Sequence, residues 1–318
     1  MKIAILGCGV AGLSAARELR QHGIEAVLFD KSRGVGGRMS TRYAEAWEFD
    51  HGAQFFTVQD ADFQVEIDAA IEAGAAAPWD AKALYLKTGS LSGDTGRARY
   101  VGTPRMNSLP KYWAAGLNVN LGRRVASVSK AESWTIRFEN GATETGFDGV
   151  ISTLPPAQAE KILPAGFVKR SSVEAAEMHA CFCLMIGLSE PINPGWDTLR
   201  VKDLPIDWIS INSAKPGRSQ EVGTIVVHSE AAWSDANVDA EREWIQDMML
   251  KSASALLGLP LEQAPHIALH RWLYASNKTS PDMPCLKGHG LVVAGDWCLG
   301  GRVQGAWLSG RAAARAFI

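Results

Sequence analysis

Buried strands on either side of a helix are predicted by the apolar positions at the start of the chain. Residues 3–6 and 26–29 are short, continuous apolar runs, and residues 13–20 between them carry apolar side chains at helical spacing. Continuous runs of this kind are typical of parallel strands that are covered on both faces. We therefore expect a strand, a helix and a second strand that share one parallel sheet.

The middle of the chain has a different pattern. Residues 61–77 place apolar side chains on one helical face, whereas residues 133–139 alternate between apolar and polar, as half-buried strands do. Further strands are predicted over 181–188, 207–211, 222–228 and 291–294, with helices over 240–257 and from residue 303 onward. Parallel-sheet patterns at both ends, with strands of antiparallel type between them, predict a nucleotide-binding domain interrupted by a second domain.

The length of the chain supports this division. Its 318 residues exceed the size at which one hydrophobic core usually stops growing. We predict an α/β protein with a Rossmann-type domain and an interleaved α+β substrate domain whose sheet is mostly antiparallel. The predicted boundaries are 1–58, 100–165 and 276–318 for the nucleotide-binding domain, and 59–99 and 166–275 for the substrate domain.

Composition and charge exclude several classes of protein. Hydrophobic residues make up 47% of the chain and the net charge is −2, so neither a disordered chain nor a nucleic-acid binder is expected. Five cysteines without a CxxC pair indicate reduced thiols and predict neither a disulfide framework nor a metal site. We expect a cytoplasmic monomer without a membrane partner, because no apolar run reaches membrane-spanning length and no heptad seam is present.

A glycine-rich motif joins the first predicted strand to the helix. Gly7, Gly9 and Gly12 form a GxGxxG pattern, and Asp30 ends the second strand. In this pattern the first glycine permits a tight turn, the second lets the backbone approach a pyrophosphate, and the third lets helix and strand pack closely. The acidic side chain accepts hydrogen bonds from a ribose. The motif predicts a dinucleotide and leaves NAD and FAD both open.

Two further motifs resemble the glutathione-reductase-like flavoproteins. They are Gly36-Gly37-Arg38 directly after the second strand, and Gly295-Asp296 followed by Gly301-Arg302-Val303 before the last helix. The resemblance implies non-covalent FAD, with Arg38 at the pyrophosphate and the last helix pointing its N-terminus at the flavin pyrimidine. The cofactor contacts that it implies are Gly7, Gly9, Ala11, Gly12, Asp30, Lys31, Gly37, Arg38, Gln54, Val125, Asp296, Arg302 and Val303.

Within that superfamily the chain most closely resembles the bacterial renalases. The residues that carry the likeness include Phe29–Gly34, Gly52–Thr57, His270–Ala275 and Gly295–Leu299. The resemblance covers essentially the whole chain. It implies oxidation of the 2- and 6-dihydro isomers of β-NAD(P)H to β-NAD(P)⁺, with electrons passing through FAD to O₂ and giving H₂O₂.

Such a reaction requires little acid–base catalysis by the protein. The hydride leaves because the pyridine ring becomes aromatic, so we expect no catalytic acid or base and a sparsely charged aromatic pocket. None of the histidines has a partner at the spacing of a known nucleophile or base. His51 or Cys298 would be the candidates for a covalent flavin link, which we do not expect. The predicted substrate contacts are Gln54, Phe55, Phe56, Arg99, Tyr100, His228, Trp233, Tyr274 and Trp297.

Two other functions stay open at this level. The first is a flavin amine oxidase or a related flavin desaturase. Many amine oxidases have a tyrosine just before the last flavin helix, where this chain has Arg302, and a fixed cation repels an ammonium. The second is an FAD-binding scaffold without turnover, against which the intact Gly301–Gly305 helix start argues.

Overall fold

A parallel sheet at one end of the molecule contains the predicted strand–helix–strand unit. The computed structural model describes residues 1–93, 96–202 and 205–318. β1 (Lys2–Leu6), α1 (Val10–Gln21) and β2 (Glu25–Phe29) form as predicted. The sheet order is β19-β20-β13-β1-β2-β9, and every pair is parallel except β19 with β20. The other strands are β9 (Asn118–Asn120), β13 (Gly149–Ser152), β19 (Leu286–Lys287) and β20 (Leu291–Val293).

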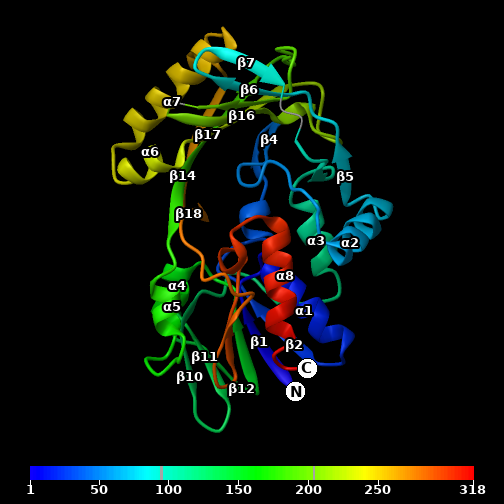
Figure 1. The fold of residues 1–318 in the computed structure, drawn as a ribbon, viewed down its shortest axis with the longest axis vertical. Helices are drawn as coiled ribbons and strands as arrows, with labels where there is room; N and C mark the ends of the chain where they lie inside the picture. Colours follow the sequence, from blue (N-terminus) through cyan, green and yellow to red (C-terminus); the bar gives the residue numbers. More distant parts are fainter. Residues whose placement is uncertain (94–95, 203–204) are drawn as a thin grey trace.

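The two faces of this sheet are covered by different elements. α8 (Val303–Ala314) packs beside α1 on one face (Figure 1). On the other face lies an antiparallel sheet, and Phe29 contacts its residues Phe138 and Phe147 edge to face. Its strands are β10 (Val125–Lys130), β11 (Trp134–Phe138) and β12 (Thr143–Phe147), and the short helices α4 (Pro156–Ile162) and α5 (Arg170–Glu174) follow β13. We call this half the nucleotide-binding body.

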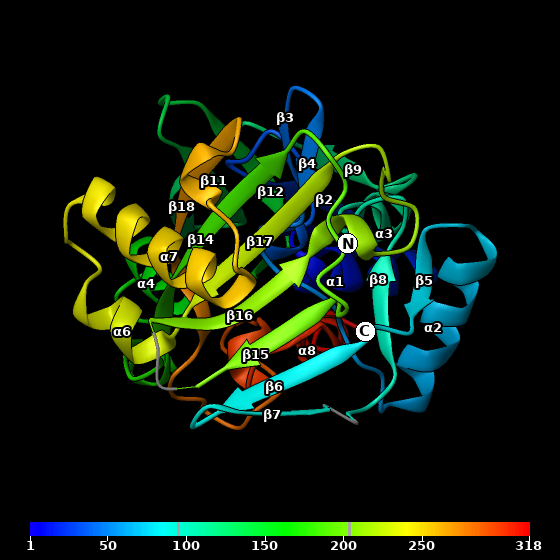
Figure 2. The same ribbon diagram turned by 90° about the horizontal axis from the view of Figure 1, so that it is seen from above.

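A seven-stranded sheet forms the other half of the molecule. Its order is β18-β14-β17-β16-β15-β6-β7, antiparallel throughout except for the parallel pair β15 and β6. Helices α6 (Ala231–Ala236) and α7 (Arg242–Leu257) cover one face (Figure 2). The strands are β6 (Ala83–Lys87), β7 (Ser90–Gly93), β14 (Met178–Leu188), β15 (Thr198–Val201), β16 (Ile206–Ile211), β17 (Gly223–Ser229) and β18 (His266–Asn277).

Alternation along β14 decides what each face of this sheet touches. Phe182, Leu184 and Ile186 pack in the same cluster as α7, whereas Cys183 and Met185 point to the opposite face, as the two-residue period of a strand requires. There they meet the hairpin of β3 (Arg42–Ala44) and β4 (Trp47–Phe49), which reaches up from the nucleotide-binding body. This hairpin is one of the links between the two halves.

The helix expected over 61–77 is shorter in the structure and lies against the nucleotide-binding body. The expected helix over 61–77 ends early: α2 covers Ala61–Glu72, Gly74 has a φ of 71°, and β5 (Ala76–Trp79) pairs with β8 (Arg99–Gly102). Phe63 of α2 lies against Trp307 of α8 and Trp113 of α3 (Ser108–Ala114). Residues 61–79 therefore pack with the nucleotide-binding body. Residues 94–95 and 203–204 of the predicted substrate domain lie outside the described residues.

The remaining elements are short 3₁₀ turns: η1 (Gly37–Met39), η2 (Asn212–Ala214), η3 (Leu261–Gln263) and η4 (Asp296–Leu299). None of the helices in the described part of the chain is both long and apolar enough to cross a membrane. In the same residues no cluster of histidine, cysteine and acidic side chains is arranged to hold a metal ion.

Candidate functional site

Two glycine-rich segments lie side by side at the start of α1. Gly7 has a φ of 108°, and a Cβ at Gly12 would lie 1.9 Å from the Gly7 carbonyl oxygen, which no side chain allows. The Gly36 amide donates to the Cys8 carbonyl at 2.8 Å, and Gly9 and Gly36 form a parallel bridge. No side chain caps the N-terminus of α1, so backbone amides at its first turn stay available to an anion.

Asp30 holds the ends of both segments together. Its carboxylate accepts the Cys8 amide at 2.7 Å on one oxygen and the Ser32 amide at 2.7 Å on the other. Each carboxylate oxygen has a second lone pair, and Asp30 lines the cleft. The side chain can therefore stabilise the loop and still accept a hydrogen bond from a ribose hydroxyl.

An ion pair joins the early and late motifs of the sequence. Arg38 donates to both oxygens of Asp296, at 2.8 and 2.5 Å, and also to the Ala275 carbonyl at 3.1 Å. Asp296 begins η4, which leads into α8 through Arg302, whose φ is 75°. α8 has no side-chain cap and no acidic residue in its first turn, so its positive end faces the cleft unneutralised.

The cleft between these segments and the seven-stranded sheet is large and strongly basic. Its volume is about 2140 Å³, whereas ligand pockets usually measure about 300–1000 Å³. Among the described residues, thirteen lysines and arginines but four acidic residues line it, an excess of nine positive charges in a chain whose net charge is −2. A cofactor with a pyrophosphate fits this lining, and the volume leaves room for a second ligand.

The residues expected at the cofactor come together in this cleft. All of them line it except Gly12, which lies behind Gly7 and serves the packing of α1 on β1. The glycine cradle, the Asp30 carboxylate, Arg38 and the two uncapped helix ends together fit FAD. Cys298 is buried away from the cleft, and His51 is not among its lining residues, so neither is placed for a covalent link.

Six of the nine residues expected at the substrate line the cleft as well: Gln54, Phe55, Phe56, Arg99, His228 and Tyr274. Arg99 is buried, donates to Thr198 Oγ1 at 3.0 Å, and lies over the Phe55 ring at 4.7 Å. Arg99 therefore restrains the ring of Phe55 in the wall of the cleft.

Three of the expected aromatic residues do not reach the cleft. Tyr100 stacks on the far side of Phe56, with which it also shares backbone hydrogen bonds. Trp233 packs between Phe182 and Trp244, near α7. Trp297 is 1% exposed and donates its indole N–H to the Leu154 carbonyl at 3.2 Å. Each of these rings has a packing role, which is the commoner use of a buried aromatic side chain.

Other wall residues were not expected from the sequence. Cys181, Arg200, Trp208, His270 and Trp272 also line the substrate half of the cleft. Trp208 lies on the predicted strand β16, on the face that points into the cleft, and Trp272 lies within the segment that carries the family likeness. Both residues could therefore have been found from the sequence. Arg200 and Cys181 lie on strands whose inward face is visible only in the assembled sheet.

Neutral histidines form part of the substrate wall. His228 donates Nε2–H to the His51 carbonyl at 3.2 Å, and the Trp272 indole donates to the same oxygen at 2.9 Å. Burial lowers the pKa of His228 to about 4 and that of His51 to about 3. Burial also lowers the pKa of His270. These three histidines are therefore uncharged at neutral pH.

We expect this wall to make the protein sensitive to mild acid. In the folded protein the pKa of His228 lies below its unfolded value near 6.5. The contribution of neutral His228 to the free energy of unfolding is therefore fully present above pH 6.5 and decreases as the pH falls toward 4. The loss is about 1.4 kcal/mol per pH unit for one such histidine. Urea unfolding at pH 7 and pH 5 measures it. His228→Asn, which does not titrate, should lose less over this interval, and an equal loss in both proteins would contradict the assignment.

Comparisons with known proteins agree with this geometry. Residues 5–65 match the model of the NAD(P)-binding Rossmann-like domain, and residues 71–318 match that of the flavin containing amine oxidoreductases. A 4,4'-diapophytoene desaturase of Staphylococcus aureus (strain Newman) is 40% identical over 60 residues, which are 19% of this chain and only 12% of that protein.

Solved structures share the whole fold at low sequence identity. Reduced UDP-galactopyranose mutase has a TM-score of 0.80 at 12% identity, over 99% of this chain and 93% of its own. Cyclohexylamine oxidase from Brevibacterium oxydans IH-35A has a TM-score of 0.75 at 12% identity, over 99% and 98%. Putrescine oxidase bound to putrescine has a TM-score of 0.74 at 13% identity, over 100% and 99%. The chain belongs to the flavin containing amine oxidoreductase family, and its cofactor is FAD.

Proposed function

We propose that this protein is a renalase-like oxidase of nucleotides, which converts 2- and 6-dihydro isomers of β-NAD(P)H to β-NAD(P)⁺. The observation that carries the proposal is the excess of nine positive charges along the cleft. Arg123 and Arg271 pair with Glu144 and Asp239 outside the lining, and the pyrophosphate of FAD neutralises two more charges, so a second ligand that also carries phosphates suits the cations that remain. The whole-length resemblance to bacterial renalases supports the same substrate class.

An amine substrate suits this lining poorly. Putrescine oxidase and cyclohexylamine oxidase, which share the fold, are named for amines. Here an ammonium would enter a basic cleft and meet the exposed Arg302 at the start of α8, with neutral histidines on the far wall. Like charges disfavour binding, whereas a neutral dihydropyridine with a phosphate tail is attracted.

The side chains of the cleft have positioning roles in this reaction. FAD held in the cleft would supply the hydride acceptor and the route of two electrons to O₂, so that overall a dihydropyridine, O₂ and one proton would give the pyridinium product and H₂O₂. Phe55 and Tyr274 offer flat surfaces to the pyridine ring, and His228 offers a neutral polar edge. No base is needed on the donor ring, because loss of hydride makes it aromatic.

Anaerobic mixing of the yellow holoenzyme with 6-dihydro-NAD tests the proposal, with loss of flavin absorbance as the signal. A panel of primary amines, including putrescine and cyclohexylamine, is run alongside. We expect rapid bleaching by the dihydropyridine, no bleaching by the amines, and recovery with H₂O₂ formation when air is admitted. Bleaching by an amine while the dihydropyridine stays inert would overturn the proposal, and so would inertness toward both.

A further inference from the structure

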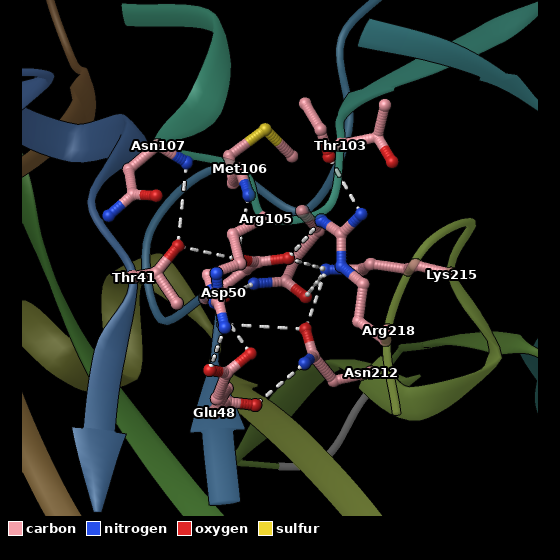
Figure 3. A network of polar contacts seen from close by, with 12 residues as sticks. Thr41, Glu48, Asp50, Thr103, Arg105, Met106, Asn107, Asn212, Lys215 and Arg218 are labelled. Carbon is pink, nitrogen blue, oxygen red and sulfur yellow. Dashed lines mark hydrogen bonds and ion pairs between the residues drawn. The ribbon is translucent and has the colours of Figure 1, made fainter. Parts of the chain in front are cut away.

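A buried ionic cluster lies directly behind the wall of the cleft. Asp50, which follows β4, is 1% exposed and accepts four hydrogen bonds. Oδ1 accepts from Thr41 Oγ1 at 2.8 Å and from the Met106 amide at 3.0 Å. Oδ2 accepts from Arg218 at 2.5 Å and from the Lys215 ammonium at 3.4 Å. Figure 3 shows Lys215 and Arg218 reaching Asp50 from the loop that follows β16.

The cluster has one positive charge more than it has negative charges. Arg218 and Lys215 are both buried, and Asp50 is the one carboxylate that bonds to them among the described residues. Burying an unmatched charge costs several kcal/mol, so a lysine kept in such a place calls for a role other than stability.

Lys215 contacts the lining of the cleft directly through the side chain of Gln54. Its ammonium donates to Gln54 Oε1 at 3.1 Å and to Asn212 Oδ1 at 2.9 Å. An ammonium only donates, so this contact fixes the orientation of the Gln54 amide, whose nitrogen donates to the carbonyls of Asp50 and Gly52. Gln54 lines the cleft between Ala53 and Phe55, and the Ala53 amide donates to the Arg38 carbonyl at 2.8 Å.

A positive charge in this place matters to electron transfer. A hydride brings two electrons and one proton, so the ring system that accepts it gains one negative charge. A cation that is buried where no solvent screens it, one hydrogen bond behind the cleft, stabilises that charge. We propose that Lys215 is a positioning residue that acts through Gln54 and makes reduction of the bound FAD more favourable. This inference rests on FAD binding alone and is independent of the proposed substrate.

The charge state of Lys215 gives the inference a measurable signature. Burial lowers the pKa of Lys215 to about 8, while Asp50 opposes the shift and Arg218 adds to it. Two other titratable groups face the ammonium, and both are neutral at pH 8: Cys183, whose pKa burial raises well above 9, and His228. Above pH 8 the oxidised enzyme has lost this proton, and a negative charge arriving in the cleft draws it back.

The experiment is a dye-mediated reduction of the holoenzyme, titrated from pH 7 to pH 9.5 without substrate. We expect the wild type to take up about half a proton more per two electrons between pH 8 and pH 9 than at pH 7, because a tenfold effect on reduction draws the lysine proton back only in part. Lys215→Met should lack this break, and at pH 7 its equilibrium constant of reduction should be about tenfold lower, the scale of one weakly screened charge. Lys251→Met, at an exposed lysine, should behave as the wild type.

Lys215→Met leaves Asp50 and Arg218 as a balanced pair, so it is expected to fold. If Lys215→Met does not fold, Lys215→Gln takes its place, because the glutamine amide still donates to Gln54 but does not titrate. A pH break that persists in the variant, or a wild type without one, overturns the inference. Because no dihydropyridine is present, failure here is separate from failure of the proposed oxidase activity.

Discussion

Asp50→Asn is expected to lower the free energy of unfolding by about 3–5 kcal/mol, the cost of leaving buried charges without their partner. The amide keeps an oxygen for Thr41 and the Met106 amide, but its NH₂ group faces Lys215 and Arg218, which are donors themselves. Two buried cations then have no counter-charge. Because the cluster ties the nucleotide-binding body to the loop after β16, we also expect weaker FAD retention.

Urea unfolding at pH 7, with flavin fluorescence and far-UV circular dichroism recorded together, measures this loss. The matched control is Asp247→Asn, which breaks an exposed pair with Lys251 one helical turn away. Such pairs contribute about 0.3–0.5 kcal/mol. If both variants lost equally little, the cluster would have no role in holding the two halves together.

Gly12→Ala is the second change with a large expected effect. The new Cβ would lie 1.9 Å from the Gly7 carbonyl oxygen, and both atoms belong to rigid backbone at the junction of β1 and α1. The helix must shift away from the strand, which we expect to cost about 3 kcal/mol, the upper end for an overpacked core. The shift also moves the amides that face the pyrophosphate, so the purified protein should carry little FAD.

Substitutions at two other glycines separate the effect on FAD affinity from the effect on stability. A Cβ at Gly9 meets no protein atom within 4 Å but projects into the lining of the cleft, so Gly9→Ala should lose FAD affinity with little change in the stability of the apoprotein. Gly166→Ala, at an exposed position with open space, should affect neither. FAD content from absorbance and melting temperature of the apoprotein report the two effects. A Gly12 variant that keeps full FAD content would contradict the role of the close approach.

The sequence by itself determined the strand–helix–strand unit of the nucleotide-binding half. β1, α1 and β2 follow local apolar periodicity, and the glycines at 7 and 12 have local steric reasons to be glycine. These features can be predicted from the sequence because each depends on residues only a few positions away. The same holds for Arg302, which directly precedes the helix that the sequence predicts from residue 303 onward.

The tertiary structure alone decided which buried residues face the cleft. The sequence does not show what the rings of Tyr100, Trp233 and Trp297 pack against, and each packs away from the cleft. For the same reason the sequence does not show that the apolar face of α2 packs against α8 and α3.

The cluster around Asp50 had no local signature at all. Lys215 and Arg218 lie 165 and 168 positions further along the chain. A lysine and an arginine that follow a strand are expected to be solvent-exposed loop residues, because charged side chains are rarely buried. Only the meeting of the β3–β4 hairpin with the loop after β16 brings the three charges together, since the free energy of a buried ion pair depends on a contact in space that spacing along the chain does not encode.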